Sequence, residues 1–388
     1  MTPYLYPGFK HLPYFLTAEE YRFPREVEEK TLGARQFPLW SGPDSVMHAC
    51  HNPSLLRAML TGSPYPIKGL YITGQNILAT RPGSRDWLEA MLKMNFIANA
   101  CHRLDPTSEY ADVVLPKTTT LEEDMVDFNG AIPGLQVFQR AIEPLGEAWD
   151  DHKICSELLR VMVSKGIIEK SYITWNNCRA FCDVQLENTG VTFDELREKG
   201  FIEYPVDYAK LSTEPFPTPT GKFEFYSTLL EKFGHDPLPN YVEPPHNEQR
   251  TPFLAQKYPL ILLTGTRKVN FHHSRFLDQE WVRKVHPYPE IEIHPEAAQV
   301  RGINDGDMVW IETPRSRDRT KMKAKITRNI HPKVVAAPMG WWLPERDGPD
   351  HALFEVNINA ALSYWEPWDP VIGVPDVCGG ELCEISKA

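Results

Sequence analysis

Hydrophobic positions in the first third of the chain predict a small parallel sheet. Residues 67–73 (IKGLYIT) form an apolar run rich in β-forming residues, and 95–101 and 111–115 are two further short runs. Between the first two runs, 85–93 is typical of a helix, with Ser84 as its expected N-cap. Because a strand, a helix and a strand at this spacing are typical of a βαβ unit, we expect the strands to be parallel.

The middle of the chain is predicted to be helical. Apolar residues recur at helical spacing from 147 to 164, Gly166 is a natural stop, and 193–199 forms a second, shorter helix. From about 205 to 258 the chain is rich in proline and polar residues, with one strand expected at 222–226. This stretch is the clearest domain boundary in the sequence.

After residue 258 the pattern changes to short strands. One small helix is expected at 295–300, where proline occupies the first position and Gly302 follows the end. The expected strands are 259–264, 290–293, 308–312, 321–328 and 334–338. Several short strands in about 130 residues indicate a barrel-like β domain, so the fold class is α/β with a parallel sheet followed by a barrel.

Composition excludes several function classes. The formal net charge of −11 argues against a broad nucleic-acid-binding surface, and no apolar run is long enough to span a bilayer. The first residues lack the features of a secretory signal, so this chain alone is expected to be cytoplasmic, without membrane contact. Seven cysteines are scattered without any C-x-x-C, which excludes a zinc ribbon or an iron–sulfur binding run here, and Cys178 and Cys182 are expected to be reduced thiols.

Two predicted strand ends carry residues that suit an extended ligand. Gly74-Gln75-Asn76 follows the strand at 67–73, and Thr264-Gly265-Thr266-Arg267 follows the strand at 259–264. Ligands of open α/β sheets bind where strands end, and backbone amides, hydroxyls and a guanidinium match phosphate. The first motif is also compatible with an ordinary turn. Neither motif has the spacing of a P-loop or a Rossmann turn, so the sequence indicates an anionic ligand without identifying it.

Other polar residues admit a functional and a structural interpretation. His272 and His273 are adjacent, and on extended chain their rings would point in opposite directions, so they are not expected to chelate a metal. Trp341 and Trp342 either line a cavity or pack in the core. The acidic run 122–124 is expected to be a solvated face. No catalytic acid or base and no metal ligand is assigned.

From about residue 44 onward the sequence resembles the molybdopterin oxidoreductases of the dimethyl sulfoxide reductase superfamily. The motifs that carry the resemblance are LYITGQN at 70–76, PTSEYADVVLP at 106–116, LLTGTR at 262–267, and the later GWW and NIN. The last two are similar to the acetylene hydratase and thiosulfate or polysulfide reductase branches. The resemblance implies a cofactor of molybdenum or tungsten held by two molybdopterin guanine dinucleotides.

The resemblance also implies binding roles for particular residues. Gly74, Gln75 and Asn76 would contact one nucleotide, and Thr107 and Asp112 would lie near a pterin or its phosphate. The remaining cofactor-binding candidates would line the pterin and phosphate groove or close its C-terminal side: Thr264, Gly265, Thr266, Arg267, His272, Ser274, Trp341, Trp342, Asn357 and Asn359.

The implied domain organisation has three parts. Residues 1–116 would be the C-terminal part of an α/β pterin-nucleotide-binding domain, and 117–250 the return segment of a second α/β domain. Residues 259–388 would be a six-stranded dinucleotide-binding barrel of the double-psi type, reached through the linker at about 205–258.

The departures from the family lead to an expectation of incompleteness. Family members carry an iron–sulfur segment and a metal-ligating residue that nothing here matches, and the family pattern N-x-E-G-R-x-Q is replaced by NGAIPGLQ at 129–136, which lacks the arginine. We therefore expect a C-terminal portion, completed by a missing N-terminal portion or a separate subunit. A [4Fe-4S] cluster is expected only in that missing part, which would also carry a twin-arginine signal if the enzyme is exported.

Several functions remain open at this point. The family chemistry is two-electron redox with oxygen-atom or sulfur transfer, and an iron–sulfur electron-transfer subunit is a further partner that it allows. The alternatives are a non-redox hydratase, a subunit of a split enzyme, a piece of a truncated reading frame, and a cofactor-free structural relative.

Overall fold

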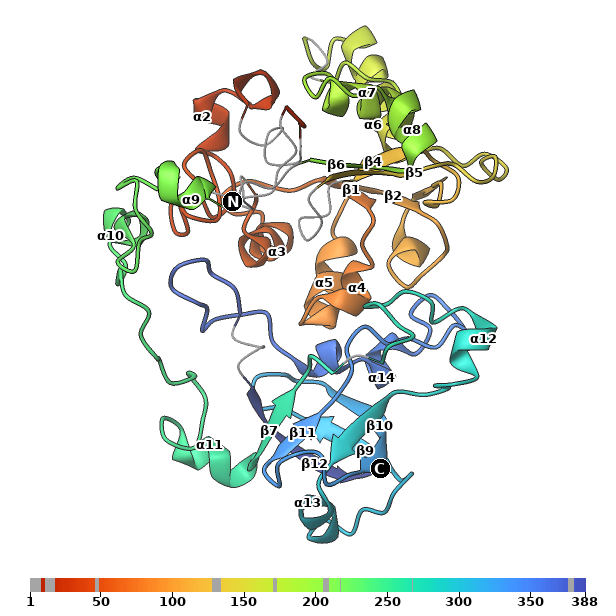
Figure 1. Ribbon diagram of the computed structural model, residues 1–388. Coiled ribbons are helices and arrows are strands. Elements are labelled where there is room, and N and C mark those ends of the chain that lie inside the picture. The colour runs from red at the N-terminus through yellow and green to blue at the C-terminus, as the bar shows by residue number, and fades with distance from the viewer. Residues whose placement is uncertain are drawn as a thin grey trace.

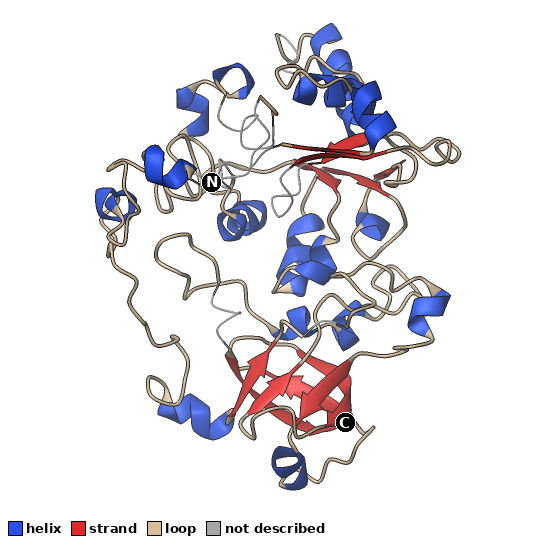
Figure 2. Cartoon of the chain, viewed as in Figure 1, coloured by secondary structure: helices blue, strands red, loops and turns tan. Residues whose placement is uncertain are grey.

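In the residues that the computed structural model describes, the strands form three β-sheets (Figure 1). The structure describes residues 8–10, 18–45, 49–127, 134–169, 173–204, 209–216, 218–266, 268–375 and 380–388. A closed barrel lies at one end of the molecule, two three-stranded sheets lie toward the other end, and helices α4 and α5 lie between them (Figure 2). The predicted α/β class with a six-stranded barrel is confirmed. No helix in the described ranges is long and apolar enough to cross a membrane.

The first sheet is parallel, with the order β1-β2-β3. Its strands are β1 (Gly69–Thr73), β2 (Phe96–Cys101) and β3 (Val113–Pro116). The neighbouring helices are α3 (Asn52–Thr61), α4 (Ile77–Thr80) and α5 (Ser84–Met91). The βαβ unit is therefore as predicted, but Ser84 is not the N-cap of α5. That position is Gly83, which has a φ of 71° and no side chain to cap the helix.

A second, antiparallel sheet of three short strands lies in the middle of the chain, where mainly helices were predicted. Its strands are β4 (Met125–Asp127), β5 (Gly134–Phe138) and β6 (Phe201–Glu203). The helices packed nearby are α6 (Asp151–Ser164), α7 (Cys178–Leu186) and α8 (Phe193–Lys199). Strands of three to five residues carry too little periodicity to be recognised, and β6 follows β5 only after all three helices.

The proline-rich linker runs along one side of the molecule as an extended arm (Figure 1). It contains α9 (Lys210–Thr213), α10 (Thr228–Lys232) and α11 (Pro252–Lys257). The strand predicted at 222–226 is wrong, because this stretch has no strand partner. Instead, the carboxylate of Glu224 accepts hydrogen bonds from Thr220 and Thr228, which hold a turn.

The barrel closes in the strand order β10-β8-β11-β7-β12-β9. Its strands are β7 (Leu260–Leu263), β8 (Glu290–Ile293), β9 (Met308–Glu312), β10 (Arg319–Ile326), β11 (Val334–Ala336) and β12 (Glu381–Lys387). Two pairs are parallel, β7 with β11 and β8 with β10, and the others are antiparallel, which agrees with the double-psi type. Alternate residues such as Leu262, Ile291 and Ile311 fill the interior.

The remaining short elements are η1 (Glu19–Tyr21), α2 (Arg25–Glu28), η2 (Ser108–Tyr110), α12 (Glu280–Arg283), α13 (Pro295–Gln299), α14 (Leu353–Val356) and η3 (Ile358–Ala361).

One hydrophobic core joins the parallel sheet to the loops above the barrel. Ile72 and Trp87 from the parallel α/β unit share this core with Phe271, Trp341 and Leu353. The α/β unit and the barrel are therefore packed against each other through apolar side chains. Any ligand bound at their joint is held by both.

The buried amide of Asn99 on β2 allows a stability prediction. Asn99 is 1% exposed, and neither its Oδ1 nor its Nδ2 has a hydrogen-bond partner in the described part of the chain. Because a buried unpaired amide costs about 1–3 kcal/mol, Asn99→Leu is expected to raise the free energy of unfolding by about 1 kcal/mol in urea denaturation. The exposed Asn95→Leu is the control and should stay within about 0.5 kcal/mol. A clear loss of stability in Asn99→Leu would contradict this interpretation.

Candidate functional site

Asn76 lies at the centre of the candidate site, directly after the end of β1. Its Oδ1 accepts hydrogen bonds from the backbone N–H of Ala79 at 3.3 Å and from the hydroxyl of Thr107 at 2.8 Å. The hydroxyl oxygen of Thr107 in turn accepts from the backbone N–H of Leu78 at 3.1 Å. Asn76 therefore caps α4 and joins it to the chain that follows β2. The structure brings these two predicted residues into direct contact.

Gly74 and Gln75 lie beside Asn76 on an exposed turn. Gly74 has a φ of 64°, a left-handed conformation that favours glycine, and no atom lies within 4 Å of the position a Cβ would take. The side-chain oxygen of Gln75 accepts a hydrogen bond from Arg81 at 3.2 Å. Backbone atoms at this turn are accessible to a ligand, as predicted for the end of a parallel strand.

Asp105 is a component of this site that sequence reasoning missed. Its Oδ1 accepts hydrogen bonds from the backbone N–H groups of Thr107 and Ser108, both at 2.9 Å, and so fixes the turn that presents Thr107. Burial raises the pKa of Asp105 to about 6. An aspartate two residues before a Thr-Ser pair is a turn signal that could have been recognised in the sequence.

Asn357 and Asn359 form hydrogen bonds to α4 from the barrel side. The Nδ2 atoms of both side chains donate to the carbonyl oxygen of Ala79, at 2.8 and 2.9 Å. The Oδ1 of Asn357 also accepts from the backbone N–H of Gly340 at 3.1 Å. Both side chains are buried, so the structure assigns them the role of fastening α4 to the barrel loops.

Trp341 and Trp342 are core residues in this structure, 2% and 4% exposed. The ring of Trp341 packs edge-on against Phe271. The indole Nε1 of Trp342 is buried and has no hydrogen-bond partner within the described ranges. Core packing is therefore the better interpretation of Trp341, whereas Trp342 keeps a donor for a ligand.

The loop after β7 brings His272 and His273 together, contrary to the prediction. Their rings touch edge to face, with centroids 4.5 Å apart. The prediction assumed extended chain, but His273 has a φ of 54°, and this left-handed residue turns its ring toward its neighbour. Thr264, Gly265, Thr266 and Ser274 lie on the same loop, partly or fully exposed, and Arg267 lies outside the described residues.

Asp112 is not brought to the site. It immediately precedes β3, and its carboxylate accepts a hydrogen bond from the backbone N–H of Ile97 at 2.7 Å. Ile97 lies near the start of β2, so Asp112 lies at the opposite end of the parallel strands from Gly74. Its observed role is to secure the pairing of β2 with β3.

The residues that the structure does bring together fit a polar, phosphate-bearing cofactor. Two buried donors at the joint, Asn76 Nδ2 and Trp342 Nε1, lack any partner in the residues described. Buried polar groups are normally hydrogen-bonded, so the unpaired donor of Asn76 beside the open turn and that of Trp342 in the shared core are groups that a bound ligand could satisfy. No group of three or more His, Cys, Asp or Glu side chains that could hold a metal ion occurs among the described residues.

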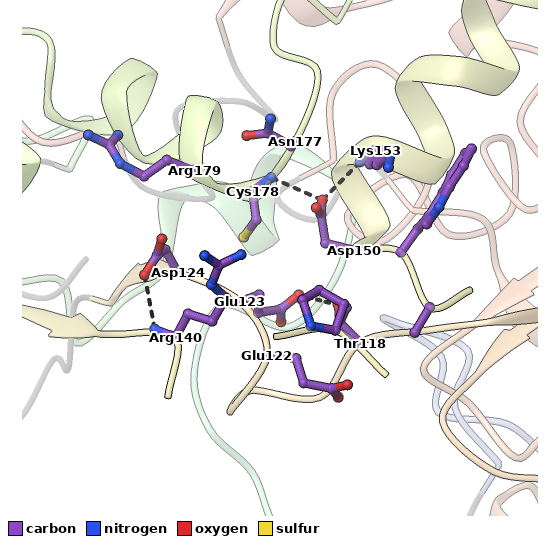
Figure 3. Close-up of a pocket in the computed structure, with 13 residues that line it drawn as sticks. Thr118, Glu122, Glu123, Asp124, Arg140, Asp150, Lys153, Asn177, Cys178 and Arg179 are labelled. Atoms are coloured by element: carbon purple, nitrogen blue, oxygen red, sulfur yellow. Dashed lines mark hydrogen bonds between the residues drawn. The ribbon is translucent and has the colours of Figure 1, made fainter. Parts of the chain in front are cut away.

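A separate cavity of about 260 Å³ lies in the middle part of the chain, between α6, α7 and the second sheet (Figure 3). Glu122 and Cys178 line it. Glu122 was expected on a solvated face, but it is buried and accepts hydrogen bonds from the backbone and hydroxyl of Thr119 and the backbone of Leu145. The donors of Thr119 lower the pKa of Glu122. The thiol of Cys178 is hydrogen-bonded to Cys182, which together with burial raises its pKa, and it is therefore a poor nucleophile at neutral pH.

Family models match two long stretches of the chain. Residues 50–161 match the molybdopterin oxidoreductase model, and residues 260–378 match the molydopterin dinucleotide binding domain. The second stretch covers most of the barrel and the first covers the parallel sheet, so the candidate site lies where the two matched regions meet. The chain belongs to the molybdopterin oxidoreductase family of the dimethyl sulfoxide reductase type.

Known members of the family are similar over most of this chain. Acetylene hydratase of Syntrophotalea acetylenica is 30% identical over 87% of this chain and 46% of its own length. A dimethyl sulfoxide/trimethylamine N-oxide reductase of Rhodobacter capsulatus is 28% identical over 74% of this chain and 37% of its own. The structure of acetylene hydratase from Pelobacter acetylenicus superposes with a TM-score of 0.86 at 26% identity, covering 98% of this chain and 55% of that one. The chain therefore spans about half the length of the relatives it matches.

The raised pKa of Asp105 predicts a pH-dependent stability. Between about pH 4, the pKa of an unfolded aspartate, and about pH 6, the folded chain binds more protons than the unfolded chain, so stability falls as the pH rises. Asp105→Asn keeps an oxygen acceptor but cannot ionise. Its free energy of unfolding relative to the native chain should therefore rise by about 2–3 kcal/mol from pH 4 to pH 7 in urea denaturation. Parallel pH profiles for the native chain and Asp105→Asn would refute the prediction.

Proposed function

We propose that this chain is the part of a molybdenum or tungsten bis(molybdopterin guanine dinucleotide) enzyme that binds and orients the cofactor. The observation that carries the proposal is two buried donors without a hydrogen-bond partner in the described part of the chain: Asn76 Nδ2 beside the turn after β1, and Trp342 Nε1 in the core shared by the α/β unit and the loops above the barrel. The match of 260–378 to a dinucleotide-binding domain supports it.

The roles of the residues follow from their positions. The turn at Gly74 and Gln75 offers backbone groups to a nucleotide, and the loop 264–266 offers small residues and hydroxyls to phosphate. Asn76, Thr107 and Asp105 hold the first of these elements in place through their hydrogen bonds. When bound, the cofactor would supply two-electron redox chemistry with oxygen-atom or sulfur transfer, and these residues would bind it and exclude water.

A non-redox hydratase is the second candidate function. The similarity to acetylene hydratase, in sequence over 87% of this chain and in structure over 98% of it, favours this candidate. Both candidates use the same cofactor and the same residues of this chain, so the proposed site does not depend on the choice. Assays of hydration and of two-electron reduction on the cofactor-loaded enzyme distinguish them.

We propose further that additional polypeptide, carrying a metal ligand and a [4Fe-4S] cluster, completes the enzyme, either within the same protein or as a separate subunit. The parallel sheet supports this proposal, because apolar side chains remain on its surface. Tyr71, Phe96 and Val113 are 38%, 49% and 40% exposed. Such a patch of neighbouring apolar residues is typical of an interaction surface. Hydrogen exchange of 96–101 and 113–116 should therefore slow when the completing part is present.

The decisive experiment measures cofactor in the purified protein. The chain is expressed with the coding sequence that completes it, and molybdenum, tungsten, pterin fluorescence and released GMP are quantified. We expect pterin and GMP in equal amounts, two of each per chain, with one metal ion. A complete, folded enzyme without pterin and GMP would refute the cofactor proposal and leave the cofactor-free structural relative.

Asn76→Leu provides the matched variant. It removes the amide beside the proposed nucleotide, and the released GMP per chain should fall several-fold. Asn95→Leu, on the exposed turn before β2, is the control and should leave the GMP content unchanged.

A further inference from the structure

A second pocket lies at the joint between α5 and the barrel and is lined by none of the cofactor candidates. It encloses about 210 Å³. Its walls come from Gly83, Arg85 and Asp86 at the start of α5, from the loop 315–318 between β9 and β10, and from residues in the range 360–365, at the end of η3 and directly after it. The family resemblance assigns no role to these residues.

Arg315 is the buried cation of this pocket. Its side chain is 9% exposed; Nε donates to Glu381 at 3.0 Å and Nη1 to the carbonyl oxygen of Trp365 at 3.4 Å. Its Nη2 is buried without a hydrogen-bond partner in the described part of the chain. Because buried N–H groups are rarely left unpaired, Nη2 is available to an acceptor that enters the pocket.

The other walls are also rich in donors. Arg317 contacts Glu89 and Asp86 but is 61% exposed, so its guanidinium can turn toward a ligand. Arg85 pairs with Asp318 at 2.7 Å. Three guanidinium groups thus line the pocket, and each is paired with at least one carboxylate of the chain.

The start of α5 adds backbone donors. The N-cap is Gly83, which has no side chain to satisfy the first amides of this eight-residue helix. Unsatisfied amides at a helix N-terminus, together with the helix dipole, favour an anion. This feature and the unpaired Nη2 of Arg315 are independent of each other and indicate the same class of ligand.

We propose that this pocket binds a small phosphate-bearing anion, with Arg315 Nη2, Arg317 and the first amides of α5 as its donors. Guanidinium groups suit phosphate oxygens because their N–H groups match the spacing of two oxygens. The ligand would bridge α5 and the barrel, and its binding would tighten the joint against which the cofactor-binding turn packs. None of the cofactor candidates lines this pocket, and binding is expected in the chain with or without the cofactor.

Titration with inorganic phosphate tests this proposal. The purified full chain in phosphate-free buffer is titrated by calorimetry, with sulfate and acetate as parallel ligands. We expect one saturable site per chain, competition by sulfate, and binding of acetate at least about tenfold weaker. Arg315→Lys keeps a charge for Glu381 but removes Nη2, and Arg317→Ala removes an exposed guanidinium; each should weaken binding by about tenfold.

The matched control is Arg319→Ala. Arg319 lies over the ring of Trp310 and pairs with Glu312 on the neighbouring strand, outside the pocket, so phosphate affinity should not change. The proposal is overturned if phosphate binding does not saturate, if acetate binds as tightly as phosphate, or if Arg319→Ala weakens binding as much as Arg317→Ala. If Arg315→Lys does not fold, Arg317→Ala still tests the proposal, because the side chain of Arg317 is largely exposed and its loss should not disturb the fold.

Discussion

Asn357→Leu is expected to lower the free energy of unfolding by about 3–5 kcal/mol. The side chain is 0% exposed and makes three hydrogen bonds: its Nδ2 donates to the carbonyl of Ala79, and its Oδ1 accepts from the backbone N–H groups of Gly340 and Asn359. Leucine fills a similar volume but leaves the two amides buried and unpaired. Each such group costs about 1–3 kcal/mol, so the sum is a large part of the stability of a domain.

Urea denaturation of the full chain measures this loss, and the exposed Asn329→Leu serves as the control, expected within about 0.5 kcal/mol. The result also separates two roles for Asn357. The family resemblance suggested a contact with the cofactor, whereas its hydrogen bonds indicate a fastening of α4 to the barrel. A variant that keeps its stability but loses cofactor would favour the first role and contradict the prediction.

The regular elements with long or strongly alternating patterns could be predicted from the sequence. The strands β8 and β9 begin and end where the alternation of apolar residues predicts, and α8 matches its predicted range. In contrast, β12 was missed, although it closes the barrel between β7 and β9. Its pairing joins residues more than 70 positions apart, and no local pattern records such a partner.

The candidate site was predictable only in part, for a topological reason. Strand ends predicted that Gly74 and Asn76 lie at the edge of the sheet where the parallel strands end, and the structure places them there. The family motif at 106–116 implied that Thr107 and Asp112 both lie near a pterin, but Asp112 precedes its strand and therefore lies at the other edge of the sheet. A motif that is continuous in sequence can thus supply one residue to each end of a sheet.

The contacts across the joint could not be predicted at all. The convergence of Asn357 and Asn359 on the carbonyl of Ala79 connects residues about 280 positions apart in the chain. The contact between the rings of His272 and His273 depends on a left-handed residue that is not glycine or asparagine, a conformation that sequence patterns do not predict. Both features depend on tertiary packing, which overrides local preference.

Arg315→Leu is the second substitution with a large expected effect, again about 3–5 kcal/mol of destabilisation. Arg315 and Glu381 form an ion pair at 3.0 Å, with side chains 9% and 2% exposed. Removing the guanidinium takes the charge of Arg315 away from the Glu381 carboxylate, which stays buried. The exposed pair of Lys333 and Glu248 is the control: Lys333→Leu should change stability by less than about 0.5 kcal/mol.

The double variant Arg315→Leu/Glu381→Leu tests whether the destabilisation in Arg315→Leu comes from the loss of charge pairing. Because the desolvation of two charges offsets most of their attraction, replacing both by apolar side chains should restore most of the stability that the single variant loses, to within about 1–2 kcal/mol of the native chain. Urea denaturation in phosphate-free buffer keeps any anion in the pocket from contributing. A double variant as unstable as Arg315→Leu alone would mean that packing around Arg315, and not its charge, holds β12 to the loop after β9.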